Sequence, residues 1–98
     1  MDLLVIFSNP RMLRRMTGLV SSARRRGHSV TVFFNEESVK LLLDHEALRE
    51  VDAKMLACVS ACENIGIKQS DMPKKGRVTS LGEVVMLMEK SDRTLVLE

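Results

Sequence analysis

Two cysteines, Cys58 and Cys62, are the side chains of this sequence best suited to covalent chemistry. Both lie in residues 55–66, a stretch that begins as a short apolar run and ends at a glycine. We interpret the run as a buried strand and the remainder as a helix that starts just after Cys58. This junction would place Cys58 at the carboxyl edge of an α/β sheet, where such sheets bind ligands. The first amides and the dipole of the helix would favour the thiolate, which is the nucleophile.

Cys62 follows four residues later, about one turn into the predicted helix. A free cysteine is among the most buried residue types and packs as a small hydrophobe. For Cys62 we therefore favour packing in the core over a role as a second, resolving thiol. For Cys58 the residues alone leave burial and reactivity equally open. The two cysteines and two histidines match no zinc-binding spacing, so no metal site is predicted.

Short apolar and β-branched stretches predict the strands that position the cysteines. They are residues 3–7, 29–34, 54–58, 77–79 and 93–97. Helical segments are predicted between them, over 10–26, after Asn35, as an irregular turn over 46–53, over 59–65, and after Ser80, where Ser80 and Glu83 match a capping box. The alternation predicts an α/β fold in one domain, residues 1–98. We expect a flavodoxin-like three-layer sandwich with a mainly parallel sheet of about five strands.

Composition narrows the classes of function. The chain carries a net charge of +2, is 45% hydrophobic and 29% charged, as in ordinary soluble proteins. The N-terminal apolar run is too short for a secretory signal, and no stretch is long enough to span a membrane. With two cysteines and no secretory segment, we expect a cytoplasmic protein. No glycine-rich phosphate loop follows the first strand, so a nucleotide cofactor is not indicated.

The predicted first helix is rich in arginine. Six arginines lie between residues 11 and 26. Binding to nucleic acid is the weaker interpretation, because the net charge is small and no aromatic side chains are interleaved for base stacking. We favour a solvated helix face, with an interface to an acidic partner as a third option. Residues 67–76 have the most loop-like composition. We consider that they form a flap over Cys58, in which Lys74 or Lys75 would favour the Cys58 thiolate.

Three segments together resemble the DsrE/DsrF-like family of small sulfur-relay proteins. They are Gly27-His28-Ser29-Val30-Thr31-Val32-Phe33-Phe34, then Cys58-Val59-Ser60-Ala61-Cys62-Glu63-Asn64-Ile65-Gly66, then Leu81-Gly82-Glu83 with Ser91-Asp92-Arg93-Thr94-Leu95-Val96. Their order and spacing cover nearly the whole chain. The sequence departs from the family at Glu37-Ser38-Val39, where many members have Asp-Gly-Val, and at Cys62, where the sulfur-carrying members have a small residue.

The resemblance implies a flavodoxin-like subunit of a homo-oligomer, a dimer, trimer or hexamer. It also implies that Cys58 carries sulfane sulfur as a persulfide, taken from a sulfur-donor protein and passed to an acceptor protein without metal or organic cofactor. This function would make the protein a sulfurtransferase. Two alternatives remain open: a dithiol redox protein that uses Cys58 and Cys62, and a non-catalytic structural or regulatory subunit. Neither nucleic acid nor a membrane is expected as a partner.

Overall fold

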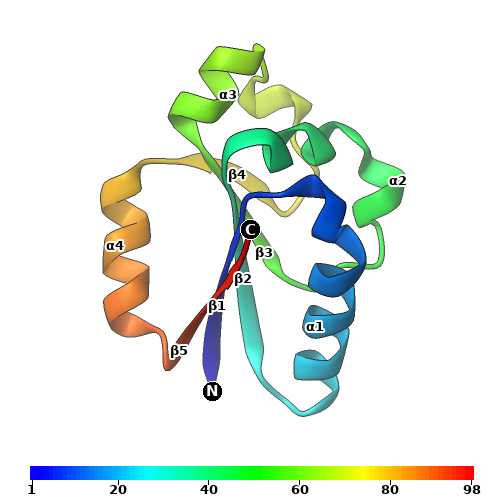
Figure 1. The fold of residues 1–98 in the computed structure, drawn as a ribbon, viewed down its shortest axis with the longest axis vertical. Coiled ribbons are helices and arrows are strands. Elements are labelled where there is room, and N and C mark those ends of the chain that lie inside the picture. Colours follow the sequence, from blue (N-terminus) through cyan, green and yellow to red (C-terminus); the bar gives the residue numbers. More distant parts are fainter.

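A parallel five-stranded sheet forms the centre of the computed structural model, which describes residues 1–98 (Figure 1). The strands are β1 (Asp2–Phe7), β2 (Ser29–Phe34), β3 (Lys54–Cys58), β4 (Gly76–Thr79) and β5 (Arg93–Leu97). They lie in the order β4-β3-β2-β1-β5, and every neighbouring pair is parallel. The predicted α/β fold class is therefore confirmed. Strands β1 to β4 lie side by side in the order of the sequence, and β5 pairs with the other edge of β1.

Four α-helices connect the strands, together with short 3-10 segments. The helices are α1 (Leu13–Arg25), α2 (His45–Leu48), α3 (Val59–Ile65) and α4 (Leu81–Lys90), and the 3-10 segments are η1 (Pro10–Met12), η2 (Glu36–Leu43) and η3 (Gln69–Asp71). The predicted helix after Asn35 is thus a 3-10 segment. Its cap is as predicted, because the Asn35 side chain accepts a hydrogen bond from the Glu36 amide. Gly66 ends α3 in the left-handed region with φ +87°, which favours glycine.

The two faces of the sheet are covered very unequally. Along each strand alternate side chains point to opposite faces. On one face a cluster of 20 buried residues packs between the sheet and α1, η2, α2 and α3. On the other face only α4 covers the sheet, as Figure 1 shows. The cluster of buried residues there has four members: Leu4, Phe33, Leu56 and Val84. We call these the main face and the α4 face.

Candidate functional site

Cys58 is the last residue of β3 and the N-cap of α3, so the predicted strand–helix junction is present. Because the sheet is parallel, this junction lies at its carboxyl edge. There the half-buried Cys58 lines an open hollow of about 480 Å³ between α3 and the start of η2. Apart from Ile65, the other residues of the hollow are polar or small: Asn35, Glu36, Glu37, Ser60, Ala61 and Asn64. A thiol in this position can be reached by another molecule.

The turn that follows β2 forms the second wall of this hollow. Ser38 is fully buried, and its hydroxyl donates to the Phe7 carbonyl and accepts from the Asn35 amide at 3.0 Å. These bonds tie η2 to the ends of β1 and β2. Glu36 takes a φ of +51°, and it is the sole non-glycine residue with a positive φ. A backbone conformation this rare for a residue with a Cβ persists where neighbouring contacts determine it. The turn is therefore held in one shape beside Cys58.

Cys62 lies in a very different environment from Cys58. Its side chain is 2% exposed and belongs to the cluster of the main face. Burial raises the pKa of the Cys62 thiol, and a charge on Cys58 raises it further. Both cysteines are free thiols. Because the thiolate is the reactive form, burial and the raised pKa both make Cys62 the poorer nucleophile.

The prediction of a flap that brings Lys74 or Lys75 to Cys58 is wrong. Strand β4 runs parallel to β3, so the segment between them must return to the amino edge of the sheet. The Met55 amide accordingly bonds to the Lys75 carbonyl at 3.2 Å, and the Lys75 ammonium pairs with Asp52 at 3.2 Å. Lys74 lines a separate depression beside His45. Neither lysine lines the Cys58 hollow.

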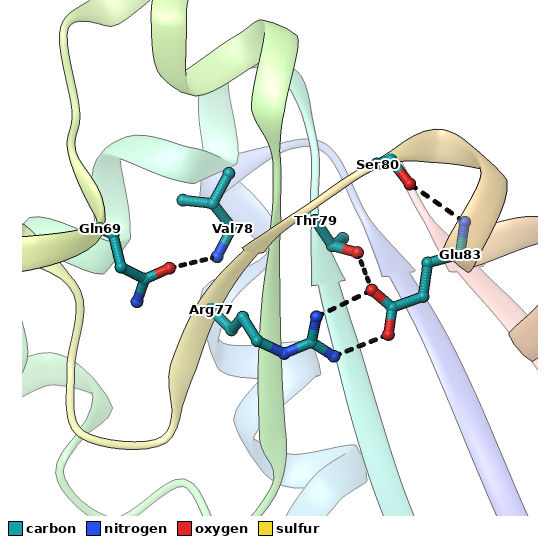
Figure 2. Close-up of polar contacts among 6 residues, drawn as sticks. All are labelled: Gln69, Arg77, Val78, Thr79, Ser80 and Glu83. Atoms are coloured by element: carbon teal, nitrogen blue, oxygen red, sulfur yellow. Dashed lines mark hydrogen bonds and ion pairs between the residues drawn. The ribbon is translucent and has the colours of Figure 1, made fainter.

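The same segment is fastened to β4, an edge strand. The Gln69 side chain accepts from the Val78 amide at 2.9 Å and donates to the Gly76 carbonyl at 3.1 Å (Figure 2 shows the first bond). A side-chain amide has the same donor and acceptor as a peptide group, so Gln69 occupies part of the free edge of β4. This attachment protects an edge that could otherwise pair with another chain.

A polar network begins at β4, the strand next to Cys58, and Figure 2 shows its residues. Thr79 is the neighbour of Cys58 in the register of β3 and β4, and its hydroxyl donates to Glu83. Arg77 makes two hydrogen bonds to the same carboxylate, at 2.8 and 2.7 Å. These bonds lower the pKa of Glu83 from 4.5 to about 2, mainly through Arg77 and then through Thr79. The network joins β4 to the start of α4 beside the site.

This network changes one prediction. The Ser80 hydroxyl accepts from the Glu83 amide at 3.4 Å, which is the first half of the predicted capping box. The second half is wrong, because the Glu83 carboxylate binds Arg77 and Thr79 instead of the Ser80 amide. The role of Arg77 was not predicted from the sequence. A basic residue in a short strand, six positions before an acid in the next helix, was the available signal.

The remaining polar side chains bring together no metal site. No group of three or more His, Cys, Asp and Glu side chains converges in the molecule. His28 contacts the N-terminal amine through Nδ1 at 3.0 Å, and His45 contacts the Asp71 carbonyl through Nε2 at 2.8 Å. Arg24 of the arginine-rich α1 pairs with Asp52 at 3.0 Å. None of the helices has both the length and the hydropathy that a membrane-spanning segment requires.

The chain belongs to the DsrE/DsrF-like family, whose model matches residues 1–97. This finding confirms the resemblance seen in the three sequence segments. No curated protein matches the sequence.

Solved structures share the fold at low sequence identity. The YchN protein from E. coli superimposes with a TM-score of 0.76 at 12% identity, covering 98% of both chains. A conserved protein of unknown function from Bacteroides thetaiotaomicron, BT1422, has a TM-score of 0.76 at 16% identity, covering 98% of this chain and 94% of its own. A protein of unknown function from Methanobacterium thermoautotrophicum, MTH1491, has a TM-score of 0.72 at 15% identity, covering 98% of both chains. Identities this low establish similarity of fold only.

Proposed function

We propose that this protein carries sulfane sulfur as a persulfide on Cys58 and passes it to an acceptor protein. In loading, the Cys58 thiolate attacks the terminal sulfur of a persulfide on a donor protein. A new S–S bond forms at Cys58, the donor's S–S bond breaks, and the donor cysteine leaves as a thiolate. Discharge repeats the step with the acceptor's thiolate as the nucleophile. Sulfur changes hands with no net oxidation, so no further reactant is needed.

The observation that supports this proposal most is the placement of the two thiols. Cys58 lines an open hollow at the carboxyl edge of the sheet, whereas Cys62 is 2% exposed within the main core. A persulfide carrier needs one thiol that a donor and an acceptor can both reach. Membership of a family linked to sulfur relay supports the same function. The fixed turn at Glu36 and the network at Thr79 hold both sides of Cys58 in place.

Whole-protein mass spectrometry after exposure to a persulfide donor tests the proposal. We expect the unmodified protein and Cys62→Ser to gain the mass of one sulfur atom, and Cys58→Ser to gain none. Iodoacetamide added before the donor should block loading by alkylating Cys58. Loading that survives in Cys58→Ser but not in Cys62→Ser would show that Cys62, and not Cys58, is the carrier. An absence of loading on all three proteins would favour a non-catalytic subunit, and a quantitative Cys58–Cys62 disulfide after mild oxidation would favour a dithiol redox protein.

We also propose that the protein functions as a homo-oligomer that associates through α4. Its Val84 is buried against the sheet, yet Leu81, Val85 and Met88 are 66%, 49% and 48% exposed. A helix with apolar residues beyond the face that its own chain covers is typical of burial against another molecule. Val96 of β5, paired in register with Ile6, is 56% exposed and extends the apolar surface. Met72 is buried and does not contribute to this surface.

A further inference from the structure

A second and larger hollow lies on the α4 face at the amino end of the strands, the opposite end from Cys58. Its volume is about 630 Å³. Thr31 and Lys54, which are register partners on β2 and β3, contribute to its floor. The end of α4 contributes Leu87 and Lys90 to its wall. Most of its lining comes from the amino ends of the strands and the end of α4, and Arg24 of α1 adds to its rim.

Two carboxylates in this hollow already have partners. Asp52 accepts from the Arg24 guanidinium at 3.0 Å and from the Lys75 ammonium at 3.2 Å, and these two bonds lower its pKa. The bonds join α1, the segment before β3 and the segment before β4 into one rim. Asp2 accepts a hydrogen bond from the Ser29 hydroxyl. The acidic side chains of the hollow therefore serve to hold its shape.

Two cations in the hollow have no partner. Lys54 and Lys90 both line it, and neither is among the ion pairs of the molecule. Four cationic side chains and two carboxylates line the hollow in all, which leaves an excess of two positive charges. The nearby Asp92 carboxylate does not line the hollow, and it accepts from the Asp2 amide at 2.6 Å. The unpartnered charges are thus two ammonium groups, one on the sheet and one on the helix.

We propose that this hollow binds a small organic dianion of the phosphate monoester class. Its volume falls in the range of small-molecule sites, about 300–1,000 Å³. Lysine binds phosphate as a point charge, and two ammonium groups match the two charges of a monoester. The hydroxyls of Thr31 and Ser91 can donate to the remaining phosphate oxygens, and Leu87 and Ala53 offer apolar contact to the organic part. This inference does not depend on the function proposed for Cys58.

Nuclear magnetic resonance titration of the labelled protein at pH 8 with ribose 5-phosphate tests the site. We expect saturable shifts of the backbone amides at Thr31, Lys54 and Lys90, and none with ribose. The double variant Lys54→Gln with Lys90→Gln should bind at least about tenfold more weakly, because each lysine contributes a charge-assisted hydrogen bond. Both side chains are exposed, so the variant should keep its fold, which an unchanged thermal midpoint would verify.

A matched control removes the same charge elsewhere. Arg14→Gln with Arg15→Gln changes two exposed, unpaired residues of α1 and should leave the affinity within about twofold. Equal weakening in both double variants would mean attraction by net charge alone and would overturn the site. The site would also be overturned by a titration that does not saturate, or by amide shifts in another part of the molecule. If succinate bound as tightly and shifted the same amides, the proposal of a phosphate monoester would be wrong and the ligand class would be a dicarboxylate.

Discussion

The main face of the sheet is complete within one chain, whereas the α4 face is not. Helices and 3-10 segments from four parts of the chain cover the main face over 20 buried residues. On the α4 face, α4 is the one covering helix, and the buried cluster there has four residues. The exposed apolar residues of α4 and most of the lining of the cation-lined hollow belong to the α4 face, whereas the Cys58 hollow lies at the carboxyl edge of the sheet between α3 and η2. Stability therefore depends chiefly on the main face, and the α4 face carries the proposed contact between subunits and the proposed anion site.

Substitutions at two adjacent phenylalanines test this difference most strongly. Phe34 lies in the main cluster, edge to face with Phe7 at 5.4 Å between ring centres, and Phe33 belongs to the α4 cluster. We expect Phe34→Ala to lower the free energy of unfolding by about 3–5 kcal/mol. Phe33→Ala should cost at least about 1 kcal/mol less, because α4 is the single helix over that side of the sheet and can move into the cavity. Urea unfolding measures both. Equal losses would contradict the division between the faces.

The second prediction concerns association through α4. At micromolar concentration, sedimentation should show a dimer or larger assembly for the unmodified protein. Val85→Lys with Met88→Lys should weaken association at least about a hundredfold, or about 2.7 kcal/mol, because unpaired charges would have to be buried. Leu43→Lys, at a residue 52% exposed on η2, is the matched control and should leave the assembly unchanged. A monomeric unmodified protein would exclude the proposed interface.

The two cysteines allow a comparison between the main core, which contains Cys62, and the carboxyl edge of the sheet, where Cys58 packs against both clusters. Cys62→Ser puts a hydroxyl into the main core and should lower the free energy of unfolding by about 1–3 kcal/mol. Cys58→Ser, at the half-buried edge position, should change it by less than about 0.5 kcal/mol. Thermal or urea unfolding under reducing conditions measures both. A larger loss for Cys58→Ser would show that Cys58 is the structural cysteine.

The smallest expected effect is at the network that fastens α4. The folded-state pKa of Glu83 is about 2, below its ordinary 4.5, so its contribution to stability is present above pH 4.5 and is lost as the pH falls toward 2. Because the ion pair is exposed, we expect about 0.5–1 kcal/mol. Glu83→Gln should abolish this part of the acid dependence, and Glu89→Gln, at an exposed residue of the same helix, should not. Identical acid unfolding of the two variants would contradict this role.

Local patterns predicted most of the strands and helices. Residues 29–34, 54–58 and 93–97 were expected as strands and are β2, β3 and β5 with the same bounds. The helix predicted over 59–65 is α3. These elements form from continuous apolar runs, caps and terminal glycines, which are signals within a few residues. The position of Cys58 at a strand–helix junction followed from the same signals.

Features that depend on distant residues could not be predicted. The strand order places β5 next to β1, and no local pattern specifies that pairing. The course of residues 73–75 depends on β4 being parallel to β3, so the expected flap with Lys74 and Lys75 was wrong. The unequal faces and the hollow at the amino edge depend on which side of the sheet each connection takes. Such choices appear only when the whole chain is assembled.

The pairing of β1 with β5 also has a consequence for biosynthesis. The strands that extend the sheet from β1 to β4 follow one another in the sequence, so they can pair while the ribosome is still adding residues. The other side of β1 stays open until β5, which follows α4, has been made. During that interval an apolar strand presents unpaired amides and carbonyls, which favours pairing with a second nascent chain. We therefore expect slow translation of the last helix and strand to increase aggregation of this protein more than slow translation of α1 or β2.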